Sequence, residues 1–183
     1  METIALPHVT RIVLTGSESV GKTTLARQLA THYGVAFVPE FVRDYAIAKG
    51  ASLTEHDTEP IARGQMALED TYIARATSLS IQDTDLVSTV VYSHHYFGQC
   101  PSFIEDAART RLADMYFLLD TDVPWVADPV RDRGDHRDDI QQQFVETLAR
   151  VHANVTHIHG NWEARFALAT AAIDAVRLRM DQR

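Results

Sequence analysis

The chain has 183 residues, of which 45% are apolar and 23% charged, and its formal net charge is −8. This length and composition are typical of one globular domain with a real core. The negative net charge argues against a protein that binds nucleic acid through a broad basic surface. A local basic groove would still be compatible with this net charge.

The single cysteine, Cys100, excludes an internal disulfide, and no Cys/His cluster has zinc-ligand spacing. The first ten residues have neither a basic start nor a long apolar stretch, so no signal peptide is predicted. No run of about 18 apolar residues is present, which predicts no membrane span. We therefore expect a cytoplasmic protein with no membrane partner.

Five short apolar segments predict β-strands. In chain order they are residues 11–15, 35–38, 79–82, 116–119 and 155–159. The segment 79–82 has the poorest pattern, because Ser80 and Gln82 interrupt its apolar residues, and its place between helical segments supports it instead.

Helices are predicted between these strands, at residues 23–32, 40–50, 61–77, 144–152 and 162–180. Residues 54–60 form a polar connection. The alternation of strands and helices predicts an α/β fold in which a parallel sheet carries helices on both faces. We expect one domain over residues 1–183, with a charged lid at about 126–140.

The sequence GSESVGKT, at residues 16–23, fits the phosphate-binding pattern G-x-x-x-x-G-K-[ST], with a strand before it and a helix after it. Its glycines let backbone N–H groups approach phosphate oxygens, Lys22 reaches the β- and γ-phosphates, and Thr23 coordinates Mg²⁺. The residues predicted to bind ATP are Gly16, Ser17, Glu18, Ser19, Val20, Gly21, Lys22, Thr23 and Thr24, together with Arg137 of the charged lid. The motif does not name the second substrate.

Carboxylates follow two of the predicted strands, where a parallel sheet faces its ligand. Glu40 could take a proton from a substrate hydroxyl, with Arg43 beside it, or the two could form only a local pair at a helix start. Asp83 is the candidate Mg²⁺ ligand, and Asp85 could bind a sugar hydroxyl. An alternative is that one of these two aspartates only caps the next helix.

The charged lid carries three arginines, which could neutralise charge on a transferring phosphoryl group or could belong to a solvated face. They are Arg131, Arg133 and Arg137. Trp125, just before the lid, could stack on a flat heterocycle or lie in the core. Gln65 could read a carboxamide or base in the acceptor pocket, or it could lie on the surface.

Five stretches together resemble the ribosylnicotinamide kinase domain of NadR-type proteins, from about Arg11 to the end of the chain. They are GSESVGKTTLARQLA, FVPEFVRDYA, GQMALED, DTDLVSTVVY and LLDTDVPWVADPVRDRG. The resemblance implies a three-layer P-loop kinase fold with sheet order 2-3-1-4-5. It also implies transfer of the γ-phosphate of ATP, with Mg²⁺, to the 5′-hydroxyl of nicotinamide riboside, which gives nicotinamide mononucleotide in NAD salvage.

The resemblance also assigns roles to residues of this chain. Lys22 and Thr23 hold phosphates and Mg²⁺, Glu40, Asp83 and Asp85 lie on the acceptor and metal side, and Asn161 neighbours adenine. Trp125 becomes a nicotinamide platform and Arg131 a lid residue. The catalytic candidates are Lys22, Glu40, Asp85, Arg131 and Arg133.

The resemblance leaves other activities open. With 183 residues we expect no room for an adenylyltransferase domain or a DNA-binding module, so the second step to NAD and repression are not expected. The alternatives are a kinase of another nucleoside or of a polynucleotide 5′-hydroxyl, and a nucleotide-dependent switch ATPase. We expect ATP and a small riboside as partners, and no nucleic acid.

Overall fold

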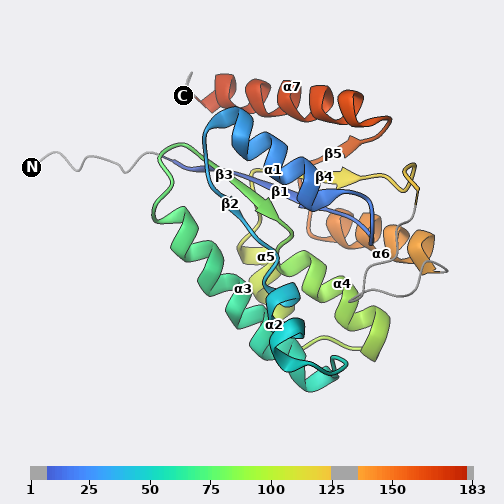
Figure 1. Cartoon of the computed structure of the whole chain (residues 1–183). Coiled ribbons are helices and arrows are strands. Elements are labelled where there is room, and N and C mark those ends of the chain that lie inside the picture. Colours follow the sequence, from blue (N-terminus) through green and yellow to red (C-terminus); the bar gives the residue numbers. More distant parts are fainter. Residues whose placement is uncertain (1–7, 125–135, 181–183) are drawn as a thin grey trace, which may run out of the picture.

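A computed structural model describes residues 8–124 and 136–180 of the chain. Its centre is a five-stranded parallel sheet in the order β2-β3-β1-β4-β5 (Figure 1). The strands are β1 (Thr10–Thr15), β2 (Phe37–Val38), β3 (Leu79–Asp83), β4 (Met115–Leu119) and β5 (Val155–Ile158). The predicted fold class and strand order are confirmed.

The central strand β1 positions the phosphate-binding loop, which follows it directly. β1 pairs with β3 from Thr10↔Leu79 to Leu14↔Asp83, and with β4 on its other side. All its residues except Arg11 are buried, as expected of a short apolar run with a strand on each side. The carboxyl ends of β1 and β3 therefore lie next to each other, which brings the loop close to Asp83.

The side chains of the sheet alternate between two apolar layers. Ile12 and Leu14 pack with α1 (Lys22–Tyr33) and α7 (Trp162–Met180), which cover one face together. Val13 points to the other face, whose core is formed with four helices. These are α3 (Thr58–Ile73), α4 (Leu86–Phe97), α5 (Ser102–Thr110) and α6 (Arg137–Arg150), and Figure 1 shows them below the sheet.

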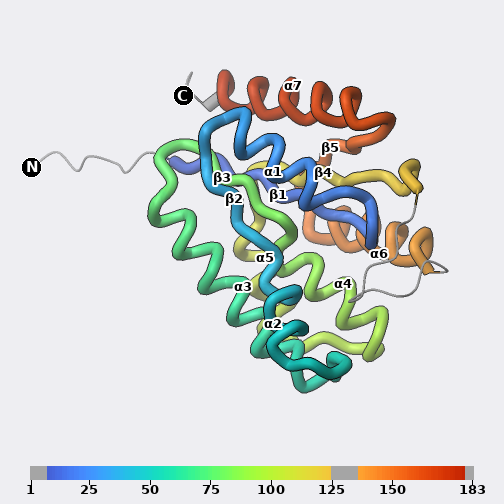
Figure 2. The backbone as a smooth tube through the Cα atoms, viewed as in Figure 1, coloured from blue at the N-terminus to red at the C-terminus, as the bar shows by residue number. Residues whose placement is uncertain are grey.

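A helical excursion follows β2 and builds one wall of the site. The backbone trace in Figure 2 leaves β2, forms α2 (Phe41–Lys49) and the short 3-10 helix η1 (Glu55–Asp57), and then enters α3. Gly50 ends α2 in a left-handed conformation, with φ of 63°. The chain thereby reverses direction beyond the sheet and returns along α3 to β3.

The connection predicted at residues 54–60 is wrong, because it is largely helical. Asp57 accepts hydrogen bonds from both the backbone N–H and the hydroxyl of Thr54, at 2.7 and 2.8 Å, and this capping box starts η1. α3 then begins at Thr58 and ends at Ile73, earlier at both ends than the predicted helix 61–77.

Three helices of the second face differ from the sequence analysis. α4 and α5 have no predicted counterpart, and α6 begins at Arg137, seven residues before the predicted start at residue 144. The end of the predicted lid, from residue 137 onward, is therefore the first turn of α6, while residues 126–135 lie outside the described part of the chain. No helix among the described residues has the length and apolar character needed to cross a membrane.

Candidate active site

The phosphate-binding loop owes its shape to three residues with positive φ. Gly16 and Gly21 have φ of 122° and 90°, and Ser19 between them has φ of 53°. α1 starts at Lys22, so the N-terminal partial charge of this helix faces the loop. The Lys22 ammonium donates hydrogen bonds to the carbonyls of Gly16 and Ser17, at 2.9 and 2.7 Å, across the space where phosphates bind in such loops.

Side chains from two distant helices hold the loop in place, and the sequence analysis missed two of them. Gln141 of α6 accepts a hydrogen bond from the Ser17 N–H at 2.9 Å. The Arg165 guanidinium, fully buried at the start of α7, donates to the Val20 carbonyl at 2.7 Å and also binds Asp122. Nothing in the local sequence could indicate the two contacts with the loop, because each joins residues more than 120 positions apart.

The predicted lid arginine Arg137 also contacts the loop. Its guanidinium donates to the Ser19 carbonyl at 3.3 Å and to the Val123 carbonyl at 2.8 Å. Asn161, the predicted adenine neighbour, accepts a hydrogen bond from the Ala164 N–H at 2.9 Å and so caps the first turn of α7. The other lid and platform predictions, Trp125, Arg131 and Arg133, lie outside the described residues.

The two predicted metal ligands lie together. The Thr23 hydroxyl donates to the Asp83 carboxylate at 2.5 Å. A hydroxyl and a carboxylate are the hard oxygen ligands that Mg²⁺ prefers, and Mg²⁺ completes its octahedron with water and substrate phosphates. The donor set therefore fits Mg²⁺. Within the described ranges, no three His, Cys, Asp or Glu side chains form a metal-binding group.

Thr84 separates the two aspartates of the DTD sequence. Its φ of 68° is left-handed, which is uncommon for a residue other than glycine. Asp83 contacts Thr23, whereas Asp85 turns away and caps α4 by accepting the Val87 N–H at 2.9 Å. Asp85 also accepts the Tyr116 hydroxyl at 2.5 Å, and its burial raises its pKa.

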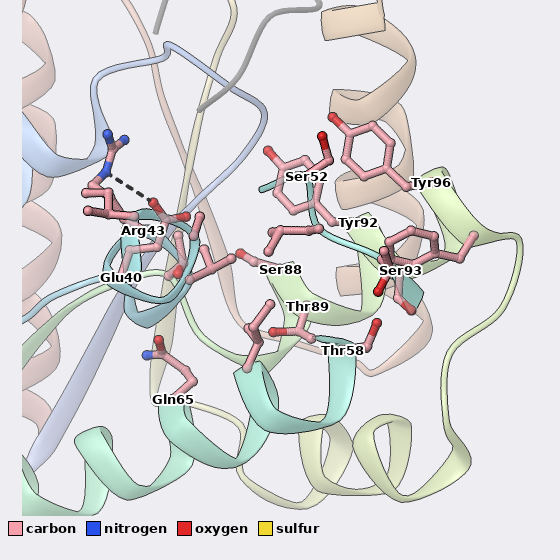
Figure 3. Close-up of a pocket in the computed structure, with 18 of the residues that line it drawn as sticks. Glu40, Arg43, Ser52, Thr58, Gln65, Ser88, Thr89, Tyr92, Ser93 and Tyr96 are labelled. Atoms are coloured by element: carbon pink, nitrogen blue, oxygen red, sulfur yellow. Dashed lines mark ion pairs between the residues drawn. The ribbon is translucent and has the colours of Figure 1, made fainter. Parts of the chain in front are cut away.

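A cavity of about 760 Å³ opens beside the loop, and it gathers the predicted acceptor residues (Figure 3). It lies between α2, the connection to α3, α3 itself and α4. Glu18 of the loop lines it as well. The predicted acceptor residues among its lining are Glu40, Arg43, Gln65 and Asp85. The structure therefore brings together residues from four separate segments of the chain.

Glu40 and Gln65 form the wall of this cavity nearest the end of β2. Glu40 is 6% exposed, and its carboxylate lies 3.9 Å from the Nε of Arg43, one turn along α2 (Figure 3). Gln65 is buried, not exposed, and its side-chain carbonyl accepts the Phe41 N–H at 3.0 Å. The Gln65 side chain thus ties α3 to the first residue of α2.

Two tyrosines of the cavity were missed by the sequence analysis. Tyr92 and Tyr96, one turn apart on α4, stack with ring centroids 6.0 Å apart and planes inclined by 11° (Figure 3). Their spacing of four residues is a usable signal once α4 is known to be a helix. They give the cavity flat aromatic surfaces.

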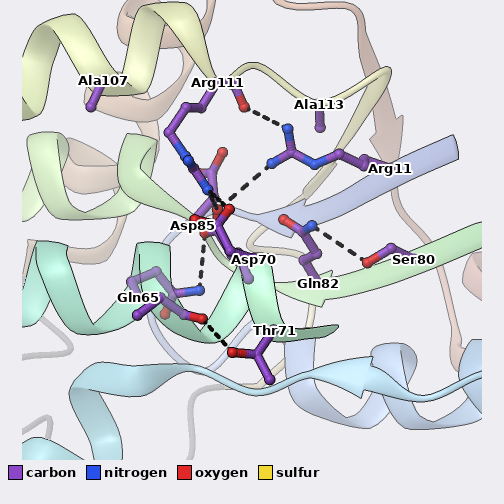
Figure 4. A network of polar contacts seen from close by, with 12 residues as sticks. Arg11, Gln65, Asp70, Thr71, Ser80, Gln82, Asp85, Ala107, Arg111 and Ala113 are labelled. Carbon is purple, nitrogen blue, oxygen red and sulfur yellow. Dashed lines mark hydrogen bonds and ion pairs between the residues drawn. The ribbon is translucent and has the colours of Figure 1, made fainter. Parts of the chain in front are cut away.

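A buried ionic network lies behind the cavity (Figure 4). Glu69 of α3 accepts a hydrogen bond from the Gln65 amide at 3.2 Å and lies 3.7 Å from Arg11 and 3.5 Å from Arg111. Burial and the nearby Asp85 carboxylate raise the pKa of Glu69 to about 7, although Gln65 and the arginines oppose the shift. Ser80 and Gln82 interrupt the β3 pattern because they face this polar side of the sheet and not the apolar layer of Leu79 and Ile81.

The chain has relatives among known proteins. The chain is homologous to the trifunctional NAD biosynthesis/regulator protein NadR of Salmonella typhimurium, with 28% identity over 86% of this chain, and of Escherichia coli, with 30% identity over 76%. It spans only 40% and 36% of the length of these two relatives.

Solved structures share the fold. A crystal structure of NadR protein in complex with NR has a TM-score of 0.76 and 22% identity over 92% of this chain and 48% of its own. A NadR complex with NAD and AMP-PNP also has a TM-score of 0.76, with 22% identity over 94% of this chain and 50% of its own. Thymidylate kinase from Ehrlichia chaffeensis has a TM-score of 0.67 and 15% identity over 93% of this chain and all of its own.

The family model described as "AAA domain" matches residues 11–165, which include the phosphate-binding loop, the acceptor cavity and Arg165. This match covers more than half of the chain. The protein is therefore a member of this AAA-domain family of P-loop proteins, with the strand order of P-loop kinases.

Proposed function

We propose that the protein is a kinase that transfers the γ-phosphate of ATP to the 5′-hydroxyl of nicotinamide riboside and so forms nicotinamide mononucleotide. The observation that carries this proposal is the carboxylate-lined cavity of about 760 Å³ beside the phosphate-binding loop. A switch ATPase, whose acceptor is water, has no need of such a cavity. Homology to NadR supports the choice of nicotinamide riboside among possible acceptors.

The donor half of the reaction belongs to the loop. Its backbone N–H groups and Lys22 would hold the β- and γ-phosphates, and Thr23 and Asp83 would hold Mg²⁺. When bound, the metal neutralises charge on the phosphates. The Lys22 ammonium, which contacts two loop carbonyls at 2.9 and 2.7 Å, would turn toward the phosphates when nucleotide binds.

The acceptor half belongs to the cavity, where Glu40 is the proposed base. The 5′-oxygen forms a bond to the γ-phosphorus as the bond from phosphorus to the ADP oxygen breaks, and the hydroxyl proton passes to the Glu40 carboxylate. Arg43, whose Nε lies 3.9 Å from the Glu40 carboxylate, would orient that carboxylate. Asp85 is less suited to this role, because the Val87 N–H and the Tyr116 hydroxyl already donate hydrogen bonds to its two oxygens.

The aromatic wall would recognise the base of the substrate. Nicotinamide riboside carries a flat, cationic pyridinium ring, which the face of Tyr92 or Tyr96 can bind through stacking and a cation–π contribution of about 1 kcal/mol. Trp125 remains a further platform candidate. Gln65 lies at the cavity wall, but its carbonyl and amide already bind Phe41 and Glu69, so we assign it to positioning the wall and not to direct contact with the base.

The test is a screen of ribosides with ATP and Mg²⁺, read by the mass shift of the product and by ADP release. We expect nicotinamide riboside to give the highest kcat/KM. A chain that phosphorylates no riboside, or only a 5′-hydroxyl oligonucleotide, contradicts the proposal. ATP turnover that is indifferent to every acceptor would favour a switch ATPase instead.

The role of Glu40 has its own test. Glu40→Gln should lower kcat by about 10²-fold to 10⁴-fold, as expected for loss of a general base, with ATP affinity retained. Asp44→Asn, on the same helix but exposed, is the matched control and should keep full activity. If Asp85→Asn loses more activity than Glu40→Gln at equal stability, Asp85 is the base and this assignment is wrong.

A further inference from the structure

Glu18 belongs to the phosphate-binding loop by sequence, but its side chain lines the acceptor cavity together with Glu40 and Asp85. It is 4% exposed, and its Oε1 atom accepts a hydrogen bond from the Tyr96 hydroxyl at 3.2 Å. Its Oε2 atom is buried and, among the residues that the structure describes, receives no hydrogen bond.

A buried carboxylate oxygen without a donor is costly, and one that lines a cavity can be satisfied by a ligand that supplies the donor. ATP is a poor ligand for this purpose, because a carboxylate next to its phosphates is repelled by them. A sugar hydroxyl is a good one, since it donates a hydrogen bond without carrying negative charge.

We propose that Glu18 binds the acceptor, with Oε2 accepting a hydrogen bond from the 2′- or 3′-hydroxyl of its ribose. This inference rests on the proposed riboside kinase function. The position of Glu18 in the phosphate-binding loop predicts a contact with ATP, whereas we assign its side chain to the acceptor. Tyr96 is a positioning residue, which holds the other carboxylate oxygen through its hydroxyl group.

The position of Glu18 means that this contact would align the acceptor with the phosphate as well as bind it. Its own backbone is part of the loop that encloses the phosphates, and Ser19 beside it has the left-handed φ of 53° on which the loop shape depends. A ribose that is bound by Glu18 is therefore fixed relative to the transferring phosphate by a single rigid segment. Such alignment of two substrates is a main source of rate enhancement.

The hydrogen bond also predicts selectivity. A site that is built to bind a substrate hydroxyl discriminates strongly against an analogue without it, because the buried acceptor is then left unpaired. We therefore expect the wild-type protein to discriminate against either 2′-deoxy- or 3′-deoxy-nicotinamide riboside.

The experiment compares wild type, Glu18→Gln and Tyr96→Phe, with Glu146→Gln of α6, an exposed glutamate, as the matched control. Calorimetry gives the Kd of nicotinamide riboside and of MgATP separately, and steady-state assays give kcat and KM. Glu18→Gln should weaken riboside binding about 30-fold, which matches a charged hydrogen bond, and leave ATP affinity unchanged or improved. Tyr96→Phe should weaken riboside binding about fivefold, again without loss of ATP affinity.

The deoxy analogues test whether Glu18 and the ribose hydroxyl act through the same hydrogen bond. With the analogue that lacks the bound hydroxyl, Glu18→Gln should cause no further loss of affinity. If Glu18→Gln does not fold, the Tyr96→Phe variant and the wild-type preference among the analogues carry the same test. The inference is overturned if Glu18→Gln leaves riboside affinity unchanged, if it weakens ATP binding equally, or if wild type accepts both deoxy analogues as well as the riboside.

Failure of this inference is distinguishable from failure of the proposed function. Riboside binding that needs Glu18 but leads to no phosphorylated product contradicts the kinase activity and supports the binding role. Normal turnover by Glu18→Gln supports the kinase and contradicts the binding role. A wild-type protein that neither binds nor phosphorylates any riboside overturns both.

Discussion

Asp83 and Asp85 are two positions apart in the sequence, but they belong to different halves of the site. Asp83 lies 2.5 Å from the Thr23 hydroxyl, and Asp85 accepts the Tyr116 hydroxyl at the same distance on the acceptor side. The left-handed Thr84 makes this division possible. The DTD sequence predicted two acidic roles, and the backbone conformation at Thr84 turns the two carboxylates toward different protein partners.

The substitution Asp83→Asn tests the proposed metal site. We expect the Mg²⁺ concentration for half-maximal activity to rise about tenfold or more, because a neutral amide replaces the charged oxygen ligand. A titration of activity against Mg²⁺ at saturating ATP measures it, with Asp44→Asn as the control. An unchanged Mg²⁺ dependence would contradict the assignment of Asp83 as a ligand.

Glu69 supplies a prediction about pH. Because its pKa is raised to about 7 in the fold from 4.5, the folded state keeps a proton that the unfolded chain releases between these values. Wild-type stability therefore falls as pH rises through this window. Glu69→Gln removes the effect, so its free energy of unfolding relative to wild type should rise by about 3 kcal/mol between pH 4.5 and pH 8.

Urea unfolding at a series of pH values measures this difference. Asp70→Asn, which changes the exposed acidic partner of Arg111, is the control and should show no comparable trend in the same window. A Glu69→Gln curve parallel to wild type would mean that Glu69 is charged throughout, contrary to the expected effect of its burial.

Among the elements, β1, β4, β5, α1, α2 and α7 were predicted close to their observed bounds. β3 was predicted from its place between helical segments, because Ser80 and Gln82 interrupt its apolar pattern. α4 was not predicted. Its sequence LVSTVVYSHHYF is rich in β-branched and aromatic residues, which have modest helix propensity. Its helical form depends on the Asp85 cap, which the sequence analysis gave as an alternative role for one of the two aspartates, and on packing against the sheet and α6, which local sequence does not reveal.

The close contact between α2 and α3 predicts the effect of a substitution at Gly64. A Cβ atom at Gly64 of α3 would lie 2.1 Å from the ring of Phe41, the first residue of α2. Gly64→Ala should therefore displace Phe41 and its hydrogen bond to Gln65, raise the KM for the acceptor and destabilise the fold by about 1–3 kcal/mol.

The acceptor KM, the ATP KM and urea unfolding together check this outcome. Only the acceptor side should be affected, since α2 does not contribute to the phosphate-binding loop. The double variant Gly64→Ala with Phe41→Leu makes room for the new methyl group and should recover much of the loss. If Gly64→Ala is as stable and active as wild type, this close contact does not constrain the cavity.

For the whole molecule, the decisive contacts join distant parts of the chain. Arg165 has no exposed surface, and it donates to the carbonyls of Val20, Asp120 and Gly160 while it pairs with Asp122. Burial works against ionisation of Asp122, but the Gly160 N–H and Arg165 hold its pKa below the usual value. The sequence predicted the sheet that carries the site, but could not predict this arginine, which looks like one of several on an amphipathic helix.

Arg165→Ala should be the most disruptive of these substitutions. Removal of a fully buried guanidinium leaves several acceptors and a carboxylate unpaired, at a cost of about 3–5 kcal/mol. Thermal and urea unfolding measure the loss, and ATP binding should weaken because the Val20 carbonyl is released. Arg179→Ala, an exposed arginine of the same helix, should have little effect, and equal stability of the two variants would contradict the role given to Arg165.

Most of the cavity beside the phosphate-binding loop is built by one continuous stretch of the chain. Apart from Glu18, the described residues that line it all fall within one uninterrupted stretch, from Glu40 to Phe97. A recombination event with one crossover before residue 40 and another after residue 97 would therefore exchange almost the whole acceptor pocket and leave the nucleotide loop in its original chain. Chimaeras made at these two points offer a direct way to transfer acceptor preference between related proteins.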